Sequence, residues 1–319
     1  MIEFIIALQA LLTATALQAL LTATLRMATP LVYTAVGETY SERAGVVNIG
    51  LEGLMLIGAC SAYAVVFYTA NLMAGVLAAI LVAALFGLAF AYLTVTVKAN
   101  QIIIGTALNM VGLGVTGFVH RTLFAQTGLA RAVVTFQNVP IPGLSAIPFI
   151  GPVFFNHNLL VYGMYVLVPL AALILEKTSF GLAIRAVGEH PRAVDSVGLR
   201  VSALRYATVI IGAALAGIGG AYLPVAHANQ FVEGMTAGRG FIALAMVAFG
   251  RWKPMGTWWA GLLFGAAFAL QLRLQAAHLN VAYQFLQILP YLVTLMALIF
   301  SRGQSAQPEA LGVPYEAGS

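Results

Sequence analysis

Long apolar stretches recur along the chain, and each is close in length to a helix that crosses a bilayer. A spanning helix needs about 20 mainly apolar residues, because the hydrocarbon core offers no water to an exposed backbone. Asp, Glu, Lys and Arg make up only 8% of the residues, against roughly 25% in a soluble domain. The sequence predicts nine spanning segments: residues 4–25, 51–69, 72–97, 102–124, 157–175, 203–223, 236–250, 256–276 and 284–300.

The predicted architecture is an all-α polytopic membrane bundle. We expect about 8–10 transmembrane helices, folded as one domain over residues 1–300. The net charge of +5 is spread between the apolar spans, a distribution that does not favour nucleic-acid binding.

One loop carries an unusual share of the charge. Residues 176–206 hold eight of the 25 charged residues, and five of the eight are basic. Cytoplasmic loops of membrane proteins are enriched in Lys and Arg, so this loop is predicted to face the cytoplasm. Counting spans from it places residues 125–156 in an external loop. The polar tail, residues 301–319, is then expected to be cytoplasmic and disordered.

A short helix is predicted inside the charged loop. Pro191 and Gly198 occupy positions that suit the first turn of a helix and the residue just past its end. A capped helix at the cytoplasmic face would suit a transporter that receives force from a soluble motor. Judged on charge alone, an ordinary solvated loop with basic anchors fits as well.

Two further stretches interrupt the apolar pattern. Residues 30–50 and 224–241 alternate short apolar pieces with charged and amide side chains. Irregular backbone at membrane depth is tolerated only where it is buried in protein or lines a wet cavity. Interrupted segments in corresponding positions of two halves point to a transport site and suggest an inverted repeat. We therefore predict two broken or re-entrant segments.

Several polar side chains fall at membrane depth, where a charge costs roughly 2.5–3.5 kcal/mol on insertion scales. A substrate pathway would explain them. Two of them also have a purely structural explanation. Glu52 would be a carboxylate that stabilises a helix terminus, and Asn109 would form hydrogen bonds between helices. The candidate pathway residues are Asn48, Glu52, Asn109, Glu233, Arg239 and Phe241.

No pattern in the sequence supports enzyme chemistry. There is no GxxxxGK[ST] loop, so the chain is not expected to bind ATP or its Mg²⁺ itself. The five histidines show no ligand spacing, and the single Cys60 excludes an intramolecular disulfide and a cysteine-based metal site. We expect no cofactor in this chain.

Several motifs resemble the permease subunits of bacterial ABC importers. They are TAVGETYSERAGVVNIGLEGLMLIGA at 34–59, NQIIIGTALNMVGLGVTGF at 100–118, KTSFGLAIRAVGEHPRAVDSVGLRVSALRY at 177–206, AGIGGAYL at 216–223 and GRGFIALAMVAFGRWKPMG at 238–256. The broad family contains ribose-type sugar and branched-chain amino-acid permeases. The combination of NQIIIGTALN with GRGFIALA is most similar to its nucleoside-uptake branch, whose binding proteins are basic membrane lipoproteins. The chain departs from the family pattern at Pro224, where Ser is more usual.

The resemblance implies a multi-pass subunit of the bacterial inner membrane without an ATPase site of its own. Its partners would be an ABC ATPase that binds ATP and Mg²⁺, a second and often non-identical permease, and an external binding lipoprotein. The charged loop would contain the coupling helix that docks on the ATPase. The residues implied for that contact are Gly188, Glu189, Pro191, Ala193, Asp195 and Gly198.

The substrate implied by the resemblance is a nucleoside, with a simple sugar as the alternative. Two other classes of protein remain to be distinguished. A secondary transporter would carry its own coupling-ion site and need no ATPase. A channel or a structural membrane protein would need no coupling loop.

Overall fold

The computed structural model describes residues 14–124, 132–276 and 307–316, with isolated positions between 288 and 296. In this part of the chain seven helices are long and apolar enough to cross a membrane. They are α2 (Ala14–Arg43), α3 (Leu51–Thr69), α4 (Leu72–Ala91), α5 (Gln101–Phe124), α7 (Leu159–Lys177), α10 (Val201–Tyr222) and α12 (Pro254–Ala276). The predicted all-α polytopic bundle is therefore confirmed, while most of the predicted span 284–300 lies outside the described residues.

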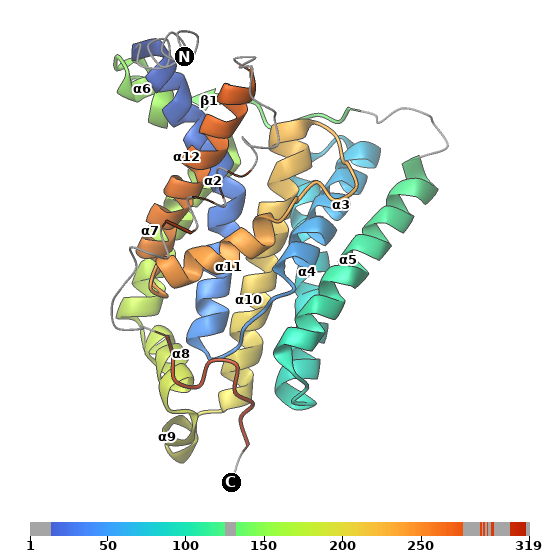
Figure 1. Cartoon of the computed structure of the whole chain (residues 1–319), viewed down its shortest axis with the longest axis vertical. Coiled ribbons are helices and arrows are strands. Elements are labelled where there is room, and N and C mark those ends of the chain that lie inside the picture. Colours follow the sequence, from blue (N-terminus) through green and yellow to red (C-terminus); the bar gives the residue numbers. More distant parts are fainter. Residues whose placement is uncertain are drawn as a thin grey trace.

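Helices α2 and α10 form the centre of the bundle (Figure 1). They approach closely because small residues face each other: a Cβ built on Gly37 would lie only 2.8 Å from the carbonyl oxygen of Gly212. Membrane helices pack through such small residues, since lipid provides no hydrophobic drive for helix association. Helices α4, α5 and α7 instead expose apolar side chains, as expected for faces that meet lipid or another subunit.

Two spanning helices end in π-helical turns. Helix α4 continues into one at Tyr92–Thr96, and α10 continues into another at Leu223–Ala228. The second turn contains Pro224, which has no backbone N–H to donate and so suits a change in the hydrogen-bond ladder. The loop 229–238 follows and leads to α11 (Arg239–Phe249). An interruption was predicted at 224–241, and this turn and loop provide it.

The other predicted interruption is shorter than expected. Residues 30–43 belong to α2, and only the connection 44–50 is irregular. The acidic side chains did not break the helix, because each finds a buried donor. The Glu38 carboxylate accepts a hydrogen bond of 2.7 Å from the Asn48 backbone, and Glu42 accepts one from the Trp252 indole.

The predicted spanning segment 236–250 is also wrong in length. Helix α11 has 11 residues and is therefore about 16 Å long, half the thickness of the hydrocarbon core. It crosses the bundle obliquely in Figure 1. Its sequence is apolar enough for a span, but it begins inside the bundle.

The two ends of the bundle carry different small elements (Figure 1). Near the start of α2 lie the 3₁₀ turn Leu144–Ala146, α6 (Ile150–Phe154) and a two-residue ladder that pairs β1 (Val139–Pro140) with β2 (Asn156–His157). At the opposite end lie α8 (Ser179–Glu189), α9 (Pro191–Ser196) and the tail segment 307–316. The described part of the predicted external loop 125–156 and the predicted cytoplasmic loop 176–206 thus occupy opposite ends.

The C-terminal tail differs from the sequence prediction over residues 307–316. This segment, which we call the tail strap, lies against the bundle, although disorder was predicted. Its backbone bonds to two segments at the end of the bundle that carries α8 and α9: Ala310 N donates to Gly188 O at 2.8 Å, and Gly312 N donates to Gly45 O at 3.0 Å. Polar composition predicted disorder, but these backbone hydrogen bonds depend on partners far away in sequence.

Candidate functional site

The N-termini of α3 and α11 meet inside the bundle at one carboxylate. Glu52 lies in the first turn of α3 and accepts hydrogen bonds from Gly238 N at 2.7 Å and from Gly240 N at 2.6 Å. These amides are at the start of α11, where backbone N–H groups lack helical partners and the helix dipole favours negative charge. Gly240 is required by the close approach, since a Cβ there would collide with the backbone of Glu52.

Asn109 fixes the start of α3 against the middle of α5. Its Oδ1 accepts a hydrogen bond of 2.8 Å from Gly53 N, and its Nδ2 donates one of 2.9 Å to Ile49 O. The connection 44–50 therefore returns into the bundle, and α3 begins level with mid-α5. Both expected structural roles are present: Glu52 is a helix-terminus carboxylate, and Asn109 joins two helices.

A cavity of about 370 Å³ opens beside these two residues. This volume is within the roughly 300–1,000 Å³ of small-molecule sites. The cavity opens along the exposed face of α5, where Met110 is 70% exposed. Its principal lining residues are Glu52, Leu56, Thr106, Asn109, Met110, Leu113, Thr236 and Phe241. The lining is mainly apolar, with a carboxylate, an amide and two hydroxyls placed around it.

The structure brings three of the six predicted pathway residues to this cavity: Glu52, Asn109 and Phe241. Asn48 is only 1% exposed and accepts a hydrogen bond from Gly50 N, so it shapes the connection before α3. Arg239 donates to the carbonyls of Met235 and Thr236, within its own chain segment.

Glu233 lies apart from the cavity lining and pairs with the far end of α5. Its carboxylate is 3.3 Å from Arg121 Nε and 3.6 Å from His120 Nδ1. These contacts tie the loop 229–238 to α5. Thr106 also lines the cavity but was not among the predicted pathway residues. Its spacing of three residues from Asn109 on a predicted helix indicates that the two side chains share a face.

The predicted short helix is present at the end of the bundle that we predict to be cytoplasmic. Helix α9 begins with Pro191, and Gly198 follows it with a left-handed φ of 83°. Ala193, Asp195 and Gly198 are exposed, and a cavity of about 470 Å³ runs between α8 and α9. Its exposed apolar side chains include those of Leu182, Val197 and Leu199. This combination forms an accessible face, which we call the α8–α9 face.

Gly188 does not belong to the accessible part of the α8–α9 face. It is buried, and a Cβ there would collide with the carbonyl oxygen of Arg43 at the end of α2. A bulky substitution at Gly188 would therefore distort the packing of α8 on α2. Glu189 is half-buried and makes an ion pair of 3.8 Å with Arg43.

The tail strap connects the α8–α9 face to the connection 44–50. Tyr315 donates a hydrogen bond of 2.8 Å to the Asp195 carboxylate, and this bond raises the pKa of the Tyr315 phenol. Arg205 on α10 donates to Ala44 O at 3.1 Å and to Val313 O at 2.9 Å. A continuous set of hydrogen bonds thus links α9, the strap and the connection that leads to Glu52.

Comparison with known proteins shows the family to which the chain belongs. Residues 20–300 match the family described as "Branched-chain amino acid transport system / permease component". The chain belongs to this family of ABC transport permeases, and it is a multi-pass protein of the plasma membrane.

Three individual relatives are similar to the chain over most of its length. The chain is 38% identical to the guanosine ABC transporter permease protein NupQ of Bacillus subtilis over 91% of this chain and 94% of that one. It is 36% identical to the nucleoside ABC transporter permease protein NupC of Lactococcus lactis, over 90% and 93%. A putative glucose ABC transporter permease protein, TsgC13 of Haloferax volcanii, is 38% identical over 80% and 77%. No solved structure matches the chain significantly.

Proposed function

We propose that this permease carries nucleosides into the cell as one membrane subunit of an ABC importer. The similarity to guanosine and nucleoside permeases over nearly the full length of the chain carries the proposal. A cavity with carboxylate, amide and aromatic groups suits it chemically: ribose hydroxyls can bond to Glu52 and Asn109, and a flat base can lie on Phe241.

The substrate path in this proposal runs along the open side of the cavity, between this chain and a second permease. The exposed apolar side chains of α5 around Met110 would then meet that subunit. Glu52 and Asn109 each already make two hydrogen bonds to backbone groups, so only about half of their hydrogen-bonding capacity is free for a ligand. We therefore expect weak substrate binding in the membrane, with selectivity supplied by an external binding lipoprotein.

Coupling to ATP hydrolysis in a partner ATPase would begin at the α8–α9 face. Movement of α8 and α9 would pull on the tail strap, through Gly188 on α8 and Asp195 on α9, and then on the connection 44–50 through Gly45. That connection leads into α3, whose first turn caps α11. Motion at the cytoplasmic face would thereby reach both helix N-termini beside the cavity.

Sugar uptake is the second candidate, and the similarity to a glucose permease over most of the chain favours it. The two are distinguished by uptake of labelled guanosine in cells that hold the remaining importer subunits, with and without this chain. We expect guanosine uptake to require the chain and to be competed by other nucleosides but not by glucose. Competition by glucose with no effect of nucleosides would overturn the nucleoside assignment.

A further inference from the structure

A third cavity, of about 290 Å³, lies at the cytoplasmic ends of several helices. It is distinct from the cavity between α8 and α9 and from the cavity beside Glu52 and Asn109, which we call the α3–α11 cavity. Four basic side chains line the third cavity: Arg43 at the end of α2, Lys177 at the end of α7, Arg185 on α8, and Lys253 before α12. They come from four chain segments that the fold brings together. We call this cavity the basic pocket.

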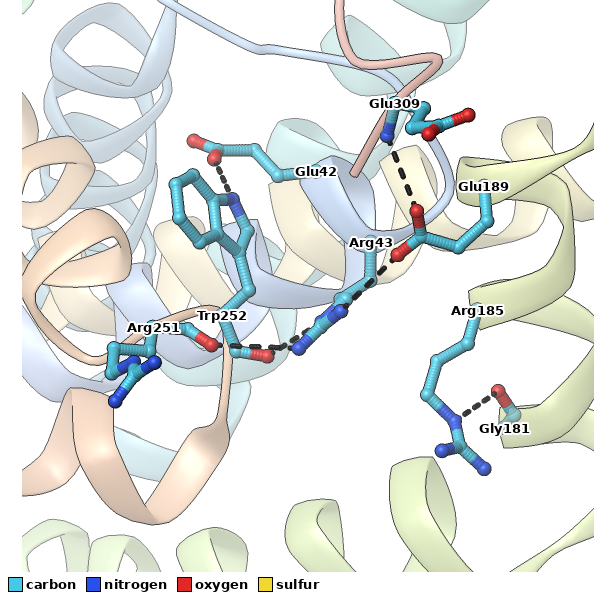
Figure 2. Close-up of polar contacts among 8 residues, drawn as sticks. All are labelled: Glu42, Arg43, Gly181, Arg185, Glu189, Arg251, Trp252 and Glu309. Atoms are coloured by element: carbon cyan, nitrogen blue, oxygen red, sulfur yellow. Dashed lines mark hydrogen bonds and ion pairs between the residues drawn. The ribbon is translucent and has the colours of Figure 1, made fainter. Parts of the chain in front are cut away.

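Positive charge in the basic pocket is only partly balanced. Of the lining residues in the described part of the chain, Glu176 alone has a carboxylate. Arg43 is 3.8 Å from Glu189 and also donates to the backbone carbonyls of Trp252 at 2.8 Å and Arg251 at 3.4 Å. Figure 2 shows Arg43 between Glu189 and these carbonyls.

The other cations have weaker partners. Among the residues that the structure describes, Arg185 donates only to the carbonyls of Gly181 at 3.4 Å and Glu176 at 3.5 Å. Within the described residues, no carboxylate lies within 4 Å of the charged groups of Lys177, Arg185 or Lys253. Three cations that line one cavity, each without a carboxylate within 4 Å in the described part of the chain, favour the binding of an anion.

The position of the basic pocket indicates which anion would reach it. Lys177 ends α7, whose outward face exposes Val166, Leu170 and Leu173 by 65%, 50% and 55%. This apolar face runs along the bilayer directly to the pocket. A ligand with a phosphate group and acyl chains can therefore place the phosphate among the cations and its chains against α7.

We propose that the basic pocket binds the phosphate of an anionic phospholipid in the cytoplasmic leaflet. Basic pockets between transmembrane helices on this side are suited to such headgroups. Arg43 would donate to the phosphate in place of its long contact with Glu189. Because Glu189 also accepts from Glu309 N of the tail strap, the bound lipid would lie next to the element that carries motion from α9.

The test is native mass spectrometry of the delipidated full-length permease during titration with phosphatidylglycerol, phosphatidylcholine or inorganic phosphate. We expect tight binding of phosphatidylglycerol and much weaker binding of phosphatidylcholine. Each basic residue near the membrane surface contributes about 1 kcal/mol to anionic-lipid attraction, which is about fivefold in affinity. The double variant Lys177→Gln/Arg185→Gln should therefore weaken phosphatidylglycerol binding about 25-fold.

The matched control is Arg200→Gln, which removes an exposed cytoplasmic charge that does not line the pocket. It should leave lipid binding unchanged. A different outcome is that inorganic phosphate binds to the wild type but not to the double variant, while no lipid class is preferred. The basic pocket would then bind the phosphate of a soluble ligand, and the lipid assignment would be wrong. Equal affinity of wild type and double variant for every ligand would overturn the proposal, whatever substrate the permease carries.

Discussion

Replacing Glu52 by Gln should loosen the start of α11 while barely changing side-chain volume. The carboxylate accepts two short bonds, from Gly238 N and Gly240 N. The Gln amide has one acceptor oxygen, so one charge-assisted bond of about 1.5–3 kcal/mol is lost and one N–H is left without a partner. Loss of negative charge beside a helix N-terminus adds about 0.3–1 kcal/mol. We take about 3 kcal/mol as the expected local destabilisation.

Hydrogen exchange measures this destabilisation directly. Amides at 238–242 exchange through local opening, and 3 kcal/mol corresponds to about 150-fold faster exchange. Uptake should fall as well, because α11 forms one wall of the cavity. Glu52→Asp keeps the charge on a shorter arm and should lie between wild type and Glu52→Gln.

Glu233→Gln is the matched control, since it neutralises a carboxylate in the loop just before α11. Its ion pairs are solvent-exposed and worth at most about 1 kcal/mol, so exchange at 238–242 should change less than about fivefold. Wild-type exchange in Glu52→Gln, or equal acceleration in both variants, would refute the capping role of Glu52.

Four further predictions concern Asn109, the α8–α9 face, the tail strap and the orientation in the membrane. Asn109→Ala removes both bonds between α5 and the start of α3 and should reduce uptake at least tenfold at equal membrane abundance; unchanged uptake contradicts this role. Ala193→Arg on the exposed α8–α9 face should uncouple ATP hydrolysis from uptake in the reconstituted importer, and coupled turnover at the wild-type ratio would exclude this contact. Tyr315→Phe loses one exposed hydrogen bond and should weaken coupling only partly. Complete uncoupling, or unchanged coupling, would contradict the proposed role of the tail strap in transmitting motion. A single cysteine at Gln137 should react with an impermeant thiol reagent from outside the cell, and one at Ser196 only from the cytoplasmic side; labelling of both from one side would contradict the predicted topology.

Local signals in the sequence predicted much of the helical framework. The span 51–69 coincides with α3, and the Pro191-to-Gly198 spacing correctly predicted α9. These elements depend on apolar length, on the fixed φ of proline and on the tolerance of glycine for positive φ, all of which are local properties. Asn109 was recognised because an amide at mid-span needs a partner.

Features that depend on distant partners were not predictable from local pattern. Glu38 and Glu42 suggested a break in α2, but partners at Asn48 and Trp252 let the helix continue. The segment of α11 was predicted to span the membrane because it is apolar. Its true start is set by hydrogen bonds to Glu52, which lies far earlier in the sequence and leaves no local signal. The tail strap looked disordered, since its order comes from Gly45, Gly188 and Arg205.

Thiol modification at Met110 tests the central proposal, that nucleosides pass along the α3–α11 cavity, most directly. In a Cys60→Ser background, Met110→Cys places a thiol at the exposed cavity wall, and Leu85→Cys places one on the exposed face of α4 as control. We predict that a charged methanethiosulfonate blocks ATP-driven guanosine uptake through Met110→Cys, that guanosine slows this reaction, and that Leu85→Cys is unaffected. Full modification of Met110→Cys with undiminished uptake would contradict the proposed path.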